Sequence, residues 1–100
     1  MENSKIEKWR TKEVEDLFSA ILSLESLEEC YDFFEDICTV KEIIDISQRL
    51  KAAIMLRNGS NYIEVAEKTG MSSATISRVS RCLEYGSGGY DLAIERLEKK

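Results

Sequence analysis

One segment of twenty residues, Tyr62 to Arg81, contains the side chains whose types and spacing could do chemistry. Four of its residues occupy positions i, i+3, i+4 and i+7, and therefore share one face of a helix. They are Ala74, Ser77, Arg78 and Arg81. Short side chains let a helix backbone approach a major groove, and arginine reaches base edges or phosphates. The pattern predicts a face that contacts double-stranded DNA.

The same segment fits a helix-turn-helix, which would position that face. Its fifth residue, Ala66, is small where two helices would cross. Its ninth residue, Gly70, lies at the turn, where a positive φ is commonly needed. Three apolar positions are predicted to pack inside: Val65, Ile76 and Val79. A helical hairpin with no role in DNA binding has the same features and is the alternative.

Other polar side chains are predicted to hold phosphates. Ser72, Ser73 and Thr75 lie at the start of the second helix, where hydroxyls beside the positive end of the helix dipole bind phosphate. The cationic candidates are Arg49, Lys51 and Lys68. For any single one of the arginines, a solvated surface position is the alternative.

Hydrophobic periodicity predicts six helices in a single domain of residues 1–100, with no strand, which is an all-α fold. Residues 1–11 read as a polar arm, and residues 12–57 as three helices expected to mediate dimerisation. Residues 62–84 hold the helix-turn-helix, and residues 90–100 the last helix, after a glycine-rich break.

Helix starts are predicted by capping sequences at Ser26–Glu29, Thr39–Glu42 and Asn61–Glu64. The third helix, about 40–57, ends at Asn58-Gly59 and is apolar on several faces, which is typical of a buried central helix.

Composition excludes several classes of function. The chain has no histidine, which removes histidine zinc ligands and imidazole acid–base catalysis, so we expect neither an enzyme nor a metal site. Its three cysteines form no C-x-x-C pair, and no signal sequence or membrane span is apparent. We therefore expect a cytoplasmic protein that has no membrane partner and whose thiols are reduced, small core residues.

Charge is distributed unevenly around a net value of −5. Residues 1–48 carry 5 basic and 13 acidic side chains, net −8, whereas residues 49–84 carry 6 basic and 3 acidic, net +3. A basic patch can bind DNA on an acidic protein. The acidic half also fits an alternative function, a protein–protein interaction module in which the helix-turn-helix is only a scaffold. An accessory role in replication or transposition is a third possibility.

From about Thr39 to Leu83 the chain resembles the Trp-repressor-like family, and most closely its YerC/YecD-type branch. The resemblance rests on Ile-Ser-Gln-Arg49-Leu, Leu-Arg-Asn-Gly59, Glu-Val-Ala66, Thr-Gly70-Met-Ser and Ala-Thr75-Ile-Ser-Arg78. It implies a transcriptional regulator, expected to be a repressor, that forms an intertwined homodimer and places two recognition helices in successive major grooves. A homodimer would also cover the apolar stripes of the first three helices, and a compact monomer is the alternative.

The resemblance also implies where a ligand would bind. Arg49 and Arg78 match the two arginines that enclose the indole in the tryptophan-binding member. That pocket needs a glycine and a serine where this chain has Val79 and Cys82. Val79 would overpack the pocket and Cys82 is a weak hydrogen-bond partner. We expect that tryptophan does not bind and that no cofactor is required, while a different small ligand stays open.

Overall fold

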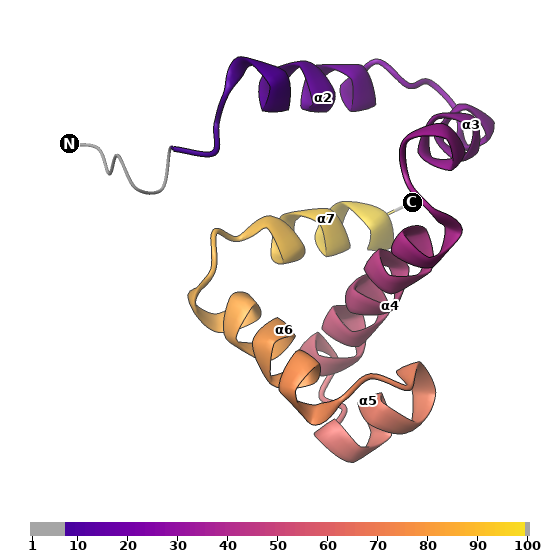
Figure 1. Ribbon diagram of the computed structural model, residues 1–100. Coiled ribbons are helices and arrows are strands. Elements are labelled where there is room, and N and C mark those ends of the chain that lie inside the picture. The colour runs from indigo at the N-terminus through magenta and orange to yellow at the C-terminus, as the bar shows by residue number, and fades with distance from the viewer. Residues whose placement is uncertain (1–7, 100) are drawn as a thin grey trace. The chain divides into compact units, whose positions relative to one another are not determined.

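The structure is a computed structural model that describes residues 8–99 (Figure 1). Within that range the chain forms six α-helices and no strand, which confirms the predicted all-α fold. The helices are α2 (Lys12–Leu22), α3 (Leu27–Ile37), α4 (Val40–Arg57), α5 (Tyr62–Thr69), α6 (Ser73–Tyr85) and α7 (Gly89–Glu98). Most of the predicted polar arm, residues 1–7, lies outside the described residues.

The described residues form two compact units, 8–39 and 40–99. Helix α4 therefore belongs to the same unit as the helix-turn-helix. Figure 1 shows α5, α6 and α7 arranged around α4 in this unit. All the buried apolar side chains of the described chain lie here: Ala52, Ala53, Val65, Ile76, Val79 and Ile94. The prediction that Val65, Ile76 and Val79 pack inside is confirmed.

The helix-turn-helix begins and ends where the sequence predicted. Asn61 Oδ1 accepts the Glu64 amide at 2.9 Å, and Glu64 Oε1 accepts the Asn61 amide at 2.9 Å, so the predicted capping box forms. Helix α5 ends at Gly70, whose φ of +73° is left-handed. Because side chains with a Cβ atom disfavour that region, glycine suits the turn. Ser72 then begins α6 by accepting the Thr75 amide at 3.2 Å.

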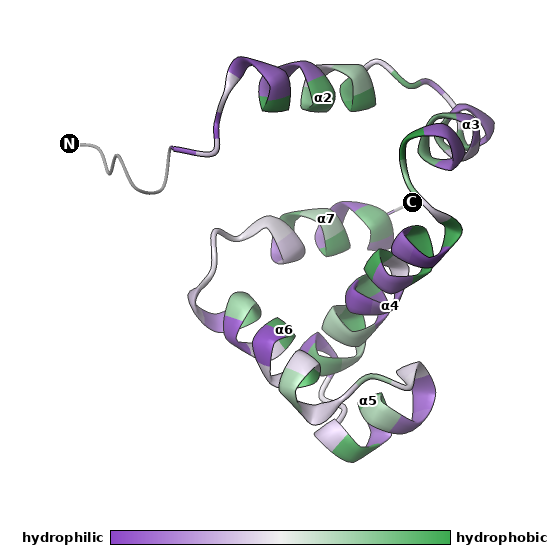
Figure 2. Ribbon diagram, viewed as in Figure 1, coloured by the Kyte–Doolittle hydropathy of each residue, from purple (hydrophilic) through white to green (hydrophobic). Residues whose placement is uncertain are grey.

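Helix α4 spans the predicted residues, but the expectation that it is buried is wrong for its first half. Val40, Ile44 and Ile46 are each more than half exposed. Only the second half contacts the core, through buried Ala52 and Ala53 and the neighbouring Leu50, Ile54, Met55 and Leu56. Figure 2 shows hydrophobic residues along its whole length. Apolar composition predicted burial all along α4, but the core forms at only one end.

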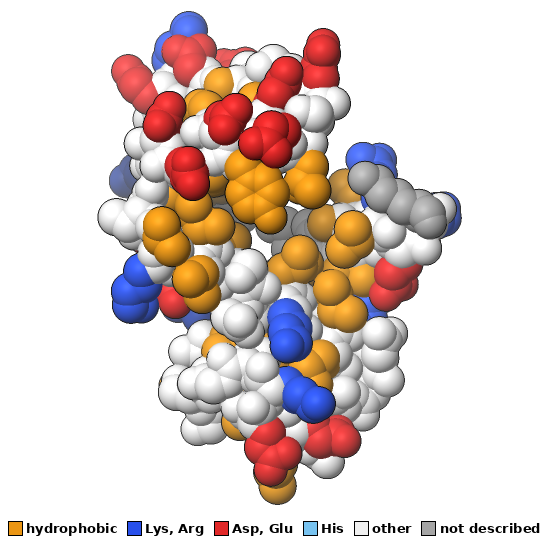
Figure 3. Space-filling model, turned by 90° about the vertical axis from the view of Figure 1, so that its right-hand side faces the viewer, with side chains coloured by type: hydrophobic (Ala, Val, Ile, Leu, Met, Phe, Trp, Pro, Cys, Tyr) orange, Lys and Arg blue, Asp and Glu red, His pale blue; other side chains and the backbone are white. Residues whose placement is uncertain are grey.

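Helices α2 and α3 are amphipathic, yet neither contains a buried residue. Leu22 is 85% exposed, Leu27 74% and Tyr31 62%. Figure 3 shows apolar side chains at the molecular surface, alongside acidic ones. The capping box at Ser26 forms only in part. Ser26 accepts the Glu29 amide, but the Glu29 carboxylate accepts the amide of Glu25 at 2.8 Å.

Candidate nucleic-acid interface

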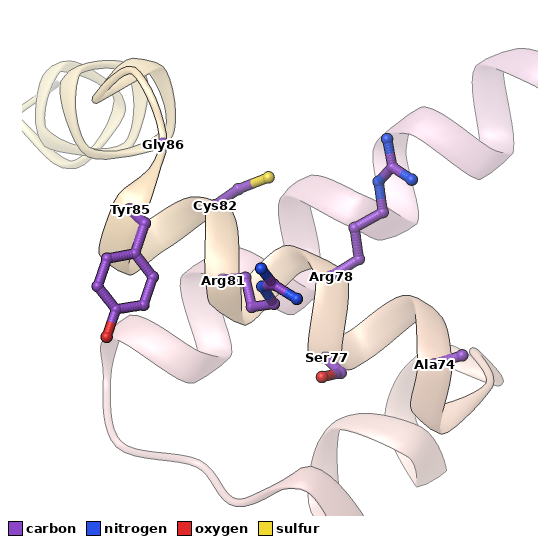
Figure 4. Close-up of a pocket in the computed structure, with 7 residues that line it drawn as sticks. All are labelled: Ala74, Ser77, Arg78, Arg81, Cys82, Tyr85 and Gly86. Atoms are coloured by element: carbon purple, nitrogen blue, oxygen red, sulfur yellow. The ribbon is translucent and has the colours of Figure 1, made fainter.

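Helix α6 presents the predicted DNA-contacting face. Ala74, Arg78 and Arg81 are exposed and Ser77 is half-buried, whereas Ile76 and Val79 are buried. The four predicted face residues come together along one side of an open hollow of about 570 Å³. Figure 4 shows them with Arg78 extended away from the helix backbone. Cys82, Tyr85 and Gly86 complete the lining. The surface is open, contains two cations, and is built on α6 and its C-terminal cap.

The two arginines on this face have no protein partner. Within residues 8–99, neither Arg78 nor Arg81 makes a salt bridge or a hydrogen bond. Several cations elsewhere are paired: Lys12 with Asp16, Lys41 with Asp45 at 2.8 Å, and Arg57 with Asp91 at 3.4 Å. The free guanidinium groups of α6 can therefore bind an anion or a base edge without first breaking an ion pair.

The hydroxyl groups at the start of α6 differ in availability. Ser72 Oγ lies 3.0 Å from Thr75 Oγ1 as well as capping the helix, so these two predicted phosphate ligands are bonded to each other. Ser73 is exposed, and no hydrogen bond engages its hydroxyl within the described residues. Ser73 is therefore the hydroxyl most available to a phosphate at this helix terminus.

The remaining predicted cations lie in two places. Lys51 Nζ on α4 donates to the Lys68 carbonyl oxygen at 3.4 Å, which brings the side chain of Lys51 to the end of α5. Both lysines are exposed. Arg49 instead lines a second hollow of about 280 Å³. The other residues of that lining are Asp45, Gln48, Thr69, Gly70, Met71 and Thr75.

The four residues predicted to hold a ligand do not line a common hollow. Arg49 lines the second hollow, while Arg78 and Cys82 line the hollow on α6. Val79 is only 3% exposed and is part of the core. The structure therefore distributes these four positions over two hollows and the core.

The expectation that all three cysteines are core residues is wrong: Cys82 is exposed, and Cys30 and Cys38 are half-buried and lie outside the core of residues 40–99. Cys82 lies four residues after Arg78, so helical spacing could have placed it on the same outward face.

Burial raises the pKa of Tyr90 on α7; the nearby Cys82 raises it further and Arg49 lowers it.

Sequence reasoning did not identify Tyr85 or Gln48. Tyr85 is 80% exposed and lines the α6 hollow; its spacing from Arg78 and Arg81 could have indicated this. Gln48 lines the second hollow, and its Oε1 atom is buried without a hydrogen-bond partner among residues 8–99. No sequence signal pointed to it.

Two other kinds of feature, a metal-binding cluster and a membrane-spanning helix, are absent from residues 8–99. No group of three potential ligands from Asp, Glu, Cys or His is placed to hold a metal ion there. None of the described helices has the length and apolar character needed to cross a membrane.

Comparison with known proteins matches most of the chain to one protein family. Residues 12–98 match the family described as Trp repressor protein. The uncharacterised protein YerC of Bacillus subtilis (strain 168) is 52% identical over 94 residues, which cover 94% of this chain and 90% of that protein.

Two solved structures are also similar. A TrpR-like protein from Eubacterium eligens matches with a TM-score of 0.87 and 58% identity, covering 91% of this chain and 94% of that one. A Trp repressor candidate from Staphylococcus aureus matches with a TM-score of 0.88 and 46% identity, covering 95% of both chains.

Proposed function

Because the chain belongs to the Trp repressor family, we propose that it is a sequence-specific DNA-binding regulator of transcription, acting as a repressor. Helix α6 enters the major groove and reads base edges through Ala74, Ser77, Arg78 and Arg81. Ser73, Lys51 and Lys68 contact phosphates beside the groove, and Arg49 is a further candidate. The site of action is the cytoplasm, where the duplex is accessible.

One observation carries this proposal: the outward face of α6 combines short side chains with two arginines that have no partner among residues 8–99. A recognition helix needs both features, since the short side chains permit close approach and the guanidinium groups supply directional donors. A scaffold helix needs neither. The loop at Gly70 and the cap at Ser72 fix the start of α6, so the face is presented without rearrangement.

We also propose that the protein works as a homodimer. Helices α2 and α3 leave Leu22, Leu27 and Tyr31 mostly exposed, and α4 does the same with Ile44 and Ile46. A monomer that exposes so many large apolar side chains is unusual, and a second copy would cover them. Two recognition helices would then meet successive major grooves and read a palindromic site. Light scattering during gel filtration should give a mass of twice 11.4 kDa.

Tryptophan is proposed not to be the effector. Its pocket would need Arg49 and Arg78 on either side of one cavity, and they line different hollows. DNA binding should therefore not depend on added tryptophan. Isothermal titration calorimetry with tryptophan tests this directly, and heat of binding at millimolar concentration or below contradicts it.

The function is tested by selecting bound sequences from a pool of random duplexes at about 150 mM salt, where non-specific phosphate binding is weak. We expect a palindromic consensus whose half-sites lie about one helical turn apart. Arg78→Ala should lose this enrichment while folding normally. Arg96→Ala is the matched control, because it removes the same charge from an exposed position on α7.

An acidic interaction module is the second candidate function. Helix α3 contains Glu28, Glu29, Asp32, Glu35 and Asp36 and no basic residue. If this surface were the functional one, the chain would capture a basic protein through these carboxylates and enrich no DNA sequence. Selection from random duplexes therefore distinguishes the two functions.

A further inference from the structure

The side chains available on α6 restrict which bases it can recognise, given that the proposed DNA-reading function holds. Between Ser73 and Leu83 the helix has no Asn, Gln, Asp or Glu. Amide side chains are the usual bidentate partners of adenine, and carboxylates accept from cytosine. The one carboxylate of α6, Glu84, lies in its last turn and does not line the hollow that Arg78 and Arg81 share. Recognition along that hollow therefore falls to the arginines, the hydroxyls and the methyl group of Ala74.

The hydroxyls contribute little to base selection. Thr75 is half-buried, bonded to Ser72, and lines the hollow on the α4 side of α6. Ser73 is the first residue of the helix, where a phosphate is the expected partner. Ser77, the half-buried Ser80 and the exposed Tyr85 remain, but a single hydroxyl both donates and accepts and so distinguishes bases poorly. Strong discrimination is left to the two arginines.

Arg78 and Arg81 are suited to guanine in particular. A guanidinium group donates in a fork that matches the O6 and N7 acceptors of guanine. Both side chains are exposed, lack an acidic partner among residues 8–99, and line the same hollow. Neither has to be released from the protein before it reaches a base.

Their spacing limits how far apart the two bases can lie. Three residues of α-helix rise about 4.5 Å. One base pair rises about 3.4 Å. If the helix axis follows the groove, the two guanidinium groups therefore meet base pairs that are adjacent or separated by one position.

From these observations we propose that each half-site of the bound duplex contains two guanines within about two base pairs of each other, one read by Arg78 and the other by Arg81. This inference rests on the proposed function and adds the identity of the bases to it. It also assigns Arg81 as a specificity-determining residue and not as a phosphate contact.

Replacing each arginine by lysine tests the assignment. Lysine keeps the charge that a phosphate contact needs but loses the fork that recognises guanine. The consensus is first selected with the unchanged protein. Each base pair of one half-site is then replaced in turn, and the affinities of the unchanged protein, Arg78→Lys and Arg81→Lys are measured for every duplex. Arg96→Lys is the control, because it makes the same exchange on α7.

For the unchanged protein, we expect replacement of either guanine to weaken binding by roughly 5- to 100-fold. Arg78→Lys should lose this preference at one guanine and Arg81→Lys at the other, with each variant keeping the preference at the remaining position. Arg96→Lys should leave the whole profile unchanged. Circular dichroism and the thermal midpoint establish that every variant is folded.

Three results overturn the assignment while leaving the proposed function intact. The first is a palindromic consensus without closely spaced guanines. The second is a guanine preference that survives in both Arg78→Lys and Arg81→Lys. The third is a loss of affinity in these variants that is equal on every duplex, since phosphate contacts produce that pattern. Absence of any enriched sequence with the unchanged protein is a different result, and it overturns the proposed function itself.

Discussion

The turn between α5 and α6 offers a direct test of how the reading helix is held. Gly70 adopts a φ of +73°, and a Cβ atom added there would meet nothing within 4 Å. Gly89 likewise leaves a Cβ atom free of contacts, and its φ is not in the left-handed region. We therefore compare Gly70→Ala with Gly89→Ala, two identical substitutions that differ only in backbone conformation.

The expected difference follows from that conformation. Alanine restricts the unfolded chain equally in both variants, so this contribution cancels between them. At residue 70 the left-handed region costs alanine about 1–2 kcal/mol. At residue 89, inside the first turn of α7, alanine adopts the helical backbone without that cost. Gly89→Ala should thus exceed Gly70→Ala in free energy of unfolding by about 1–2 kcal/mol.

Urea denaturation followed by circular dichroism measures this difference at one fixed protein concentration. With a slope of about 2 kcal/mol per molar urea, the two midpoints should differ by about 0.5–1 M. Because no atom crowds residue 70, the turn should keep its geometry, and Gly70→Ala should bind the selected duplex as tightly as the unchanged protein. Coinciding midpoints would refute the reasoning from φ, and weaker binding by folded Gly70→Ala would refute the claim that the turn is unchanged.

Three further predictions concern the packing and ends of the helices around α6. Ile94→Ala should lower the free energy of unfolding by about 2–5 kcal/mol, because the side chain is fully buried, and thermal denaturation checks this. Ser72→Ala should cost about 1 kcal/mol in urea denaturation by removing the α6 cap, and Ser73→Ala, which removes a hydroxyl that caps nothing, should cost less. Because burial raises the pKa of Tyr90 above 10.0, the unfolded chain releases its proton first, and stability should fall as pH rises from about 10 through the folded-state pKa. Tyr90→Phe should flatten that decline in denaturation curves recorded across the alkaline range.

Structural features that depend on only a few neighbouring residues could be predicted from the sequence. The capping box at Asn61 and Glu64 needs only four residues in the right order, and it forms with both bonds. The positive φ of Gly70 follows from the turn, and the burial of Val65, Ile76 and Val79 follows from helical spacing. Local chemistry and periodicity were sufficient for these features because they depend little on distant parts of the chain.

Features that depend on which surfaces meet could not be predicted. Ile44 and Ile46 are as apolar as buried residues, but burial depends on a neighbour, and these side chains are more than half exposed. Glu29 had two amides within reach and bonds to that of Glu25, a choice that composition does not determine. Gln48 Oε1, which has no hydrogen-bond partner among residues 8–99, lies where α4 meets the turn after α5. Its burial depends on that contact, so residue spacing could not indicate it.

The restriction of the buried side chains to residues 40–99 has a consequence for amide hydrogen exchange. Amides exchange through local opening, which is easiest where few apolar contacts must separate. Helices α2 and α3 contain no buried residue, so in a single copy their amides exchange by local fraying and those of α6 by more global opening. If a second copy covers the first two helices, their protection factors become dependent on protein concentration, whereas protection within the core of residues 40–99 depends on it less.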